Sequence, residues 1–310
     1  MLAVLRVFSG GHTRHKVIAT MARHHYVPQF LLRGWATNGK LYAYHWNDGA
    51  KRVIENDKAS VGSACQIRDL NVFFGVSKAQ RDFPEVGFFT PKVDTPAADV
   101  LRVMLASGLR ELTPEQRIDW ARLLVSFGVR TPEALREMGP AETEKAFMLV
   151  EAAAKGPPED EATVTKIIRE NIGLFRRNFP LRAAMEISTD PTKLHALDRM
   201  TWWIRKWNRD VILIGDRPLL TYPRQKYPCG IPLDSRDCLI ILPIAPNAVF
   251  FACANPKTQT KMRRMAPSRL ANLVNQETIF RATCVYASDG SHAKFISPRL
   301  EGKILGTWHP

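Results

Sequence analysis

The sequence predicts an α+β protein, and three features of the residue pattern predict that class. A hairpin-like pair of strands comes first, helical spacing runs over about residues 94–208, and apolar strand-like runs return from residue 210 onward. Strands and helices therefore stand in separate blocks rather than in the strict alternation of a doubly wound fold. We expect an N-terminal β-hairpin region, a helical middle and a strand-rich C-terminal part. These parts would form one mixed sheet with packed helices, in a single domain over residues 21–310.

The first predicted element is a β-hairpin. Residues 40–46 (KLYAYHW) read as a strand, residues 47–49 (Asn-Asp-Gly) as a turn, and residues 51–55 as the returning strand. Residues 57–92 mix short apolar runs with Gly and Pro and predict no regular element.

Two helix starts in the middle of the chain are marked by capping residues. Thr113 can cap a helix whose first position is Pro114, and Gln116 stands where a capping box needs an amide. Thr131 and Pro132 open another helix by the same logic.

The later part of the middle also has helical spacing. We expect helices over residues 160–177 and 181–188, after an exposed loop at residues 155–158 (Lys-Gly-Pro-Pro). Asp190 and Pro191 then open a helix that would run through Trp202, Trp203 and Trp207.

The C-terminal third alternates apolar runs with one helix. Residues 210–215 fit a buried strand, and the uncharged stretch 238–256 fits two buried strands joined by a turn. Three Pro and Asn residues in the middle of that stretch argue against a membrane-spanning helix. Residues 268–280 read as a helix and residues 281–287 as a strand.

The chain is basic, with a formal net charge of +14 and a pI near 9.8. Residues 1–36 hold five Lys or Arg and no acid, residues 199–226 hold seven against two acids, and residues 257–281 hold six against one. A fold that gathers these segments would present a face that attracts nucleic acid or another polyanion; a fold that scatters them would leave an ordinary solvated surface.

Five cysteines show neither C-x-x-C spacing nor a zinc pattern, which favours a reducing cytoplasm over a disulfide framework.

The first twenty residues are basic and acid-free, and their short apolar run is interrupted by Arg6. We interpret these residues as the product of a start codon assigned too early, with true initiation at Met21, or as a disordered extension. Deleting residues 1–20 should then leave folding intact.

Residues 24–35 (HHYVPQFLLRGW) combine paired histidines with an amide and an arginine in an otherwise apolar stretch, here called the signature. His24 and His25 are candidate catalytic acids or bases; alternatively they form structural hydrogen bonds in the core or contact a phosphate or other ligand without catalysis. Neighbouring side chains point to opposite faces of a strand, so at most one histidine should enter a given site. Gln29 and Arg33 would share a helical face, where they can hold a phosphate or carboxylate or satisfy buried carbonyls.

A second candidate is Asp216, which follows an apolar run and precedes Arg217 and Pro218. It could be a functional carboxylate at the end of a strand, or it could cap a turn.

The signature resembles the N-terminus of a bacterial family of proteins of unknown function, DUF4238. Later segments resemble the same family in the expected order: Arg130-Thr131-Pro132, Asp216 with Pro218, residues 242–246 and Asn275. The resemblance implies no established activity or cofactor, and it adds Arg130 and Asn275 as candidate ligand-binding or phosphate-binding residues.

The sequence contains no phosphate-binding P-loop, no Rossmann glycine motif and no H-E-x-x-H zinc motif. The net charge, the three basic segments and the polar candidate positions favour a nucleic-acid-binding protein as the leading hypothesis, extending to a nuclease of defence or toxin type. In metal-independent cleavage, His24 or His25 would be the acid or base, and Arg33 or Arg130 would stabilise the phosphorane charge. Asp216 would orient a histidine or, alternatively, help to hold a metal. The alternatives are a non-enzymatic interaction or regulatory protein, and a sensor of an anionic small molecule held by Arg33 and Arg130.

Overall fold

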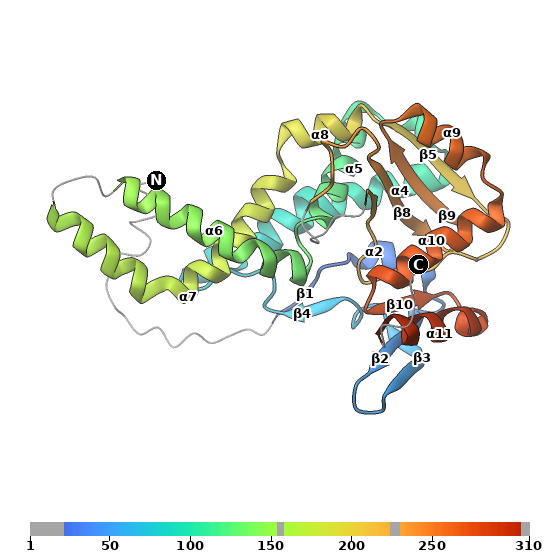
Figure 1. Ribbon diagram of the computed structural model, residues 1–310, viewed down its shortest axis with the longest axis horizontal. Helices are drawn as coiled ribbons and strands as arrows, with labels where there is room; N and C mark the ends of the chain where they lie inside the picture. Colours follow the sequence, from blue (N-terminus) through green and yellow to red (C-terminus); the bar gives the residue numbers. More distant parts are fainter. Residues whose placement is uncertain (1–21, 154–157, 224–229, 305–310) are drawn as a thin grey trace.

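The computed structural model describes residues 22–153, 158–223 and 230–304, which form the predicted α+β fold (Figure 1). The expectation of one mixed sheet is wrong, because the described strands form three separate sheets whose pairings are all antiparallel. Residues 1–20 and most of the loop expected at 155–158 lie outside the described residues.

The smallest sheet pairs β1 (Arg23–His25) with β4 (Gln66–Arg68) and contains the start of the signature. The signature continues into α2 (Gln29–Leu32) and a 3-10 turn, η1 (Arg33–Trp35). Pro28 precedes α2 with extended ψ, as expected for a residue that enters a helix from a strand.

The second sheet confirms the predicted N-terminal hairpin. Its strands, in spatial order, are β3 (Arg52–Ser60), β2 (Lys40–Asn47), β10 (Cys284–Ala287) and β6 (Ile214–Gly215). The strand expected over residues 210–215 is reduced to its last two residues, because the N–H groups of Val211 and Ile212 bind the Pro246 carbonyl instead of a neighbouring strand.

The third sheet has the order β5 (Thr201–Lys206), β9 (Ala248–Cys253), β8 (Leu239–Ala245) and β7 (Leu220–Tyr222). The predicted pair of buried strands in residues 238–256 is confirmed as β8 and β9. The helix expected to run through the three tryptophans is wrong, since α8 (Pro191–Asp198) ends before them. Trp202 and Trp203 lie in β5, which pairs with β9 along its whole length.

Both capped helix starts are confirmed. Thr113 and Gln116 form a complete capping box at the start of α5 (Pro114–Phe127). The Thr131 hydroxyl accepts the Ala134 N–H at 3.2 Å at the start of α6 (Pro132–Ala153). The two helices predicted over 160–188 are instead one, α7 (Pro158–Ser188), with Pro180 inside it.

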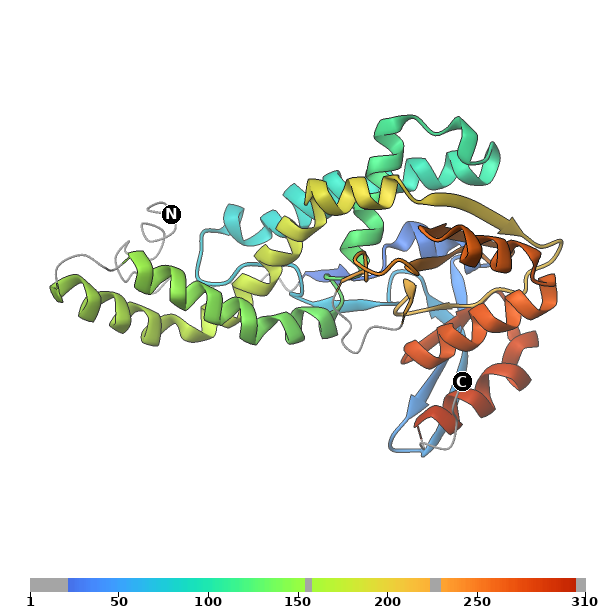
Figure 2. The ribbon, with the colours of Figure 1, turned by 45° about the horizontal axis from the view of Figure 1, so that its top comes forward.

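The remaining helices lie on either side of the third sheet or beside the second. They are α3 (Lys78–Phe83), a π-helical segment η2 (Pro84–Asp94), α4 (Thr95–Ala106), η3 (Leu109–Glu111), α9 (Pro256–Arg264), α10 (Pro267–Arg281), η4 (Gly290–His292) and α11 (Ala293–Ile304). The helix predicted over 268–280 is confirmed as α10. Helices α6 and α7 lie side by side and point away from the sheets, an arrangement visible in both ribbon views (Figures 1 and 2).

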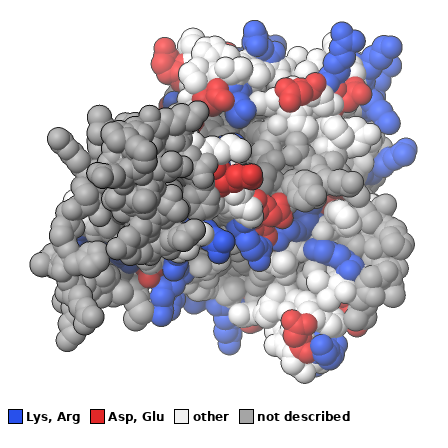
Figure 3. Space-filling model, turned by 60° about the vertical axis from the view of Figure 1, so that its left-hand side comes forward, with Lys and Arg blue, Asp and Glu red and all other residues white. Residues whose placement is uncertain are grey.

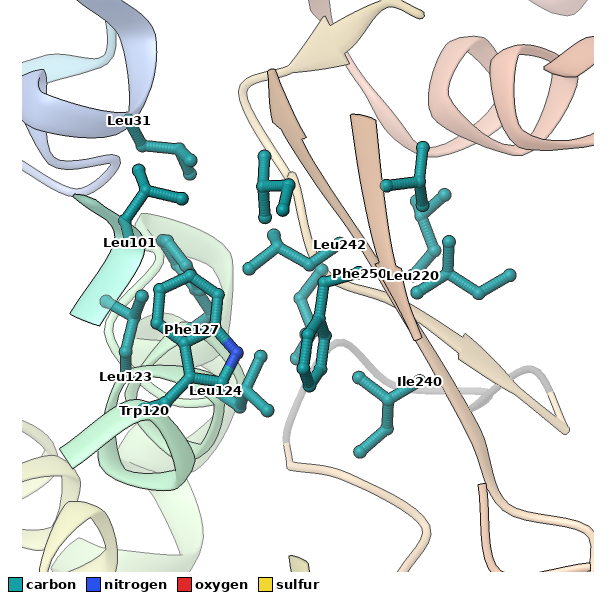
Figure 4. Packing of buried hydrophobic residues seen from close by; sticks show 14 of the residues in the cluster. Leu31, Leu101, Trp120, Leu123, Leu124, Phe127, Leu220, Ile240, Leu242 and Phe250 are labelled. Carbon is teal, nitrogen blue, oxygen red and sulfur yellow. The ribbon is translucent and has the colours of Figure 1, made fainter. Parts of the chain in front are cut away.

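The main core lies between the third sheet and helices α2, α4 and α5 (Figure 4). Trp120 of α5 meets Phe250 of β9 edge-on, with ring centroids 5.6 Å apart, and Trp202 meets the same ring at 5.2 Å. A second, smaller cluster packs Tyr44 of β2 and Val285 of β10 against α10 and α11. Burial of such large apolar side chains is the main source of folding free energy.

Candidate functional site

His24 is buried in β1, with 5% of its surface exposed. Its Nδ1 accepts the backbone N–H of Asn71 at 3.3 Å, so that nitrogen carries no proton. Burial lowers the pKa of His24, while the carboxylates of Glu85, Asp69 and Asp82 act in the opposite direction. These contacts make His24 a neutral imidazole that ties β1 to the loop after β4, and its catalytic role remains a prediction.

His25 belongs to a chain of contacts along α2. Its Nε2 lies 3.1 Å from the Gly62 carbonyl, to which it can donate, and 3.4 Å from the amide nitrogen of Gln29. The Gln29 Oε1 accepts from Arg33 Nη2 at 3.3 Å, which confirms the shared helical face predicted for this pair. Burial lowers the pKa of His25, against the raising effect of the Gly62 carbonyl. Arg33 itself is exposed.

Arg130 is 1% exposed and does not face a cleft. Its Nη1 donates to Asp94 Oδ1 at 2.7 Å and its Nε donates to the Tyr26 carbonyl at 3.1 Å. The guanidinium carbon lies 5.1 Å from the Phe127 ring centroid. Burial raises the pKa of Asp94, and the neighbouring Arg130 charge opposes that rise. Arg130 therefore joins the signature to η2 and α5 from inside the protein.

Asp216 and Asn275 are also buried, at 4% and 5% exposure. Asp216 accepts the backbone N–H of Thr283 at 2.9 Å and, through its other oxygen, the Thr283 hydroxyl. Burial raises the pKa of Asp216, and the Thr283 hydrogen bonds oppose the rise. Asn275 accepts the Leu213 N–H at 3.0 Å and donates to the Val211 carbonyl at 2.7 Å. Asn275 thus holds α10 to the chain before β6.

Tyr26 links the signature to two other parts of the chain. Its carbonyl accepts from Arg130 Nε, and its backbone N–H donates to the Cys65 carbonyl at 3.0 Å. Burial raises the pKa of its phenol, and the charges of Cys65, Asp216 and Glu133 raise that pKa further. The signature therefore meets the segment before α6 at Tyr26 rather than at the histidines.

Arg217 completes this junction. Its Nη2 pairs with Glu133 Oε1 at 2.9 Å, which links the residue after Asp216 to the helix that follows Arg130. Nearby, the Cys65 thiol donates to the Tyr286 hydroxyl at 3.4 Å. The prediction missed Tyr26, Glu133 and Arg217, and the available signal was their position directly beside His25, Pro132 and Asp216.

A basic surface lies along the β5 edge of the third sheet, where α9 covers the outer face. Arg263 of α9 stands over the Trp203 ring, 5.3 Å from its centroid, and Trp203 in turn stacks on Phe251. Trp207, just after β5, donates from its indole nitrogen to the Pro267 carbonyl at 3.0 Å. These contacts place the Arg205 and Trp207 side of β5 beside α9 and the start of α10, whereas Lys206 donates to the Leu105 carbonyl of α4 on the other face of the sheet.

Two of the three basic segments therefore come together there. We call this group the α9 basic surface: Arg205, Arg209, Lys257, Lys261, Arg263, Arg264 and Arg269. All except Arg205 are exposed, and Arg205 is partly exposed. Residues 199–209 and 256–276 contain no Asp or Glu.

Arg33 lies at the same end of the sheet. The backbone of Gly34 packs against Ala245 and Pro246 in the β8–β9 turn, and the Trp35 indole donates to the Ile212 carbonyl at 2.7 Å. In the described part of the face shown in Figure 3, Lys and Arg stand among Asp and Glu. The charge of the described residues is thus distributed unevenly, with the α9 basic surface as one concentration.

The comparison with protein families places this geometry in context. The family model described as "Protein of unknown function (DUF4238)" matches residues 23–291, which is most of the chain. The chain belongs to the DUF4238 family. In this DUF4238 protein, both the Tyr26 junction and the α9 basic surface lie within the matched range.

The searches of curated proteins and of solved structures each found no match to this DUF4238 protein. In the part of the chain that the structure describes, no helix is long and apolar enough to cross a membrane. Among the same residues, no group of three or more His, Cys, Asp or Glu side chains is arranged to hold a metal ion.

Proposed function

We propose that this DUF4238 protein binds nucleic acid through the α9 basic surface, and that the signature residues hold the fold that presents it. The observation that carries the proposal is the convergence of residues from two basic segments, around Arg205 and Arg263, at one edge of the third sheet, where residues 199–209 and 256–276 contain no Asp or Glu. Lys and Arg in such numbers attract the phosphate backbone and release its counterions.

The side chains of this surface favour backbone contact over base reading. Most of these lysines and arginines lie on α9, a helix of nine residues, or on the edge strand β5. Helix α9 packs on the sheet through the buried side chain of Met262. Phosphate contacts of this kind position a protein on nucleic acid without reading its sequence. We therefore expect salt-sensitive binding with little sequence preference.

Cleavage by the signature histidines receives less support than binding. A general acid or base must reach the proton that it transfers, either directly or through one water. His24 is buried against Asn71, and Arg130 and Asp216 are buried in contacts of their own. We propose that the His24→Ala/His25→Ala double variant lowers the stability of the protein and does not change its nuclease activity. A cleavage activity that is present in wild type and lost only in that variant would contradict the structural role of the histidines.

The binding proposal is tested by fluorescence anisotropy with labelled single-stranded RNA, single-stranded DNA and duplex DNA of about 30 nucleotides. The test variant is Lys261→Gln/Arg264→Gln/Arg269→Gln, because all three side chains are exposed on α9 and α10. We expect wild type to bind at least one probe and the triple variant to bind it at least about tenfold more weakly.

A matched control removes the same charge elsewhere. Lys51→Gln/Arg102→Gln/Arg182→Gln neutralises three exposed cations that pair with Asp48, Asp99 and Glu186, far from α9 in sequence. The control should bind like wild type. Equal weakening in both triple variants would show that net charge, not this surface, drives binding, and no binding by wild type would overturn the proposal.

A further inference from the structure

An open surface pocket of about 540 Å³, here called the cavity, lies between α6 and α7. Its lining comes from the first half of α6 and from one residue of α7: Leu135, Arg136, Gly139, Pro140, Thr143, Glu144 and Arg176. The α6 residues recur at spacings of three and four, so they share the helix face that is turned to α7. The volume is in the range of small-molecule sites, about 300–1,000 Å³.

Proline and glycine explain why the helices leave a space here. Pro140 stands inside α6 and Pro180 inside α7, and a Cβ on Gly139 would lie 3.8 Å from Pro180. Pro140 has no N–H to donate to the carbonyl of Arg136, so the helical hydrogen bond at that point is absent. The Thr143 hydroxyl donates to the Gly139 carbonyl at 2.6 Å and steadies the turn around the proline.

The charges in the cavity differ from those on the neighbouring helix surface. Lys145 pairs with Glu142 at 2.7 Å, Arg182 pairs with Glu186 at 3.0 Å, and Arg177 stacks on Phe74 at 3.8 Å. Arg136 and Arg176, by contrast, form no ion pair with any acid among the described residues. Two guanidiniums from different helices therefore border one space without an acidic partner among the residues that the structure describes.

We propose that this cavity binds a small organic oxyanion, a phosphate ester or a carboxylate. Arg136 and Arg176 supply planar, charged donors that suit the paired oxygens of such a group. Leu135 and Pro140 offer an apolar wall for the body of the ligand, and the Glu144 carboxylate can accept a hydrogen bond from a hydroxyl or amino group on it. The site is separate from the α9 basic surface, so it does not rest on the proposed nucleic-acid binding.

The test measures binding of pyrophosphate and of citrate to the full chain by isothermal titration calorimetry. The two probes distinguish a phosphate from a carboxylate preference. We expect wild type to bind at least one probe with a dissociation constant below about 1 mM. Arg136→Gln/Arg176→Gln should weaken that binding at least about tenfold, with an unchanged melting temperature in the absence of probe.

Two controls make each outcome decisive. Arg182→Gln removes a cation from the same helix outside the cavity and should bind like wild type. The Lys261→Gln/Arg264→Gln/Arg269→Gln variant should also keep probe binding, whereas the cavity variant should keep nucleic-acid binding. Absence of binding to both probes, binding unaffected by the cavity variant, or loss of binding in the α9 variant would overturn the proposal.

Discussion

Arg130 connects three parts of the chain from a position that solvent hardly reaches. Its guanidinium binds Asp94 and the Tyr26 carbonyl, and its Nη2 is buried with no partner among the described residues. Removing one member of a buried ion pair leaves the other charge uncompensated. We expect Arg130→Met to lower the free energy of unfolding by about 3–5 kcal/mol, measured by urea denaturation.

The double variant Arg130→Met/Asp94→Leu provides the matched control. It removes both charges, and apolar replacement of a whole buried pair is often nearly neutral. Recovery of at least half of the lost stability would support a structural ion pair. If Arg130→Met is as stable as wild type, Arg130 is not needed for folding. That result would contradict our interpretation and would leave Arg130 available as a ligand-binding residue.

His24 makes stability depend on pH. Because its pKa is lowered in the folded state, the unfolded chain binds more protons, so stability is present above pH 6.5 and is lost as pH falls below it. We expect His24→Gln to flatten this loss between about pH 7 and pH 5, as measured by urea unfolding across that range. The effect is partial, since the pKa of His25 is lowered too.

His195→Gln is the control for this measurement, because His195 is exposed on α8. It should show the same pH profile as wild type. A His24→Gln profile that runs parallel to the wild-type profile would contradict the lowered pKa that burial gives to His24.

At the scale of elements, Gly215 decides how closely β6 approaches α10. A Cβ at that position would lie 2.6 Å from the Cβ of Ala282 and 3.4 Å from Thr278. Neither neighbour can rotate away, so the elements would have to separate. We expect Gly215→Ala to destabilise the protein by about 1–3 kcal/mol in a thermal unfolding experiment.

Gly173→Ala is the control, because the same substitution should have the opposite effect on stability there. Gly173 lies inside α7 with open space around its Cα, and alanine favours a helix over glycine by about 0.5–1 kcal/mol. We expect this variant to gain stability. A Gly215→Ala variant that gains as much would show that the β6–α10 contact is looser than the structure shows.

The elements that the sequence predicts well are those with local signals. The capping boxes and the N-terminal hairpin depend on residues a few positions apart, and the structure confirms them. Residues 201–207 show the limit. Their tryptophan spacing resembled a helix, but the aromatic and β-branched side chains pair with β9, where Trp203 stacks on Phe251.

At the scale of the whole molecule, long-range contacts account for what sequence could not predict. The division into three sheets depends on β10 and β6 joining the N-terminal hairpin from the far end of the chain. The predicted site residues lie in separate places for the same reason. Arg130 contacts the signature at the Tyr26 carbonyl and Asp216 binds Thr283, and sequence spacing alone cannot show either of these buried contacts.

The charge pattern left open whether the three basic segments gather on one face, and the structure brings two of them together. The basic segments around residues 205 and 263 are distant in sequence, and β5, β9 and α9 bring them side by side. The central claim is that this α9 basic surface contacts phosphates directly.

The salt dependence of binding tests that claim most directly. Each phosphate contact contributes about 0.7–0.9 to the slope of log K against log salt concentration. We predict that Lys261→Gln/Arg264→Gln/Arg269→Gln reduces the wild-type slope by about 2–3, while Lys51→Gln/Arg102→Gln/Arg182→Gln leaves it unchanged. Identical slopes for wild type and the α9 variant would contradict the account.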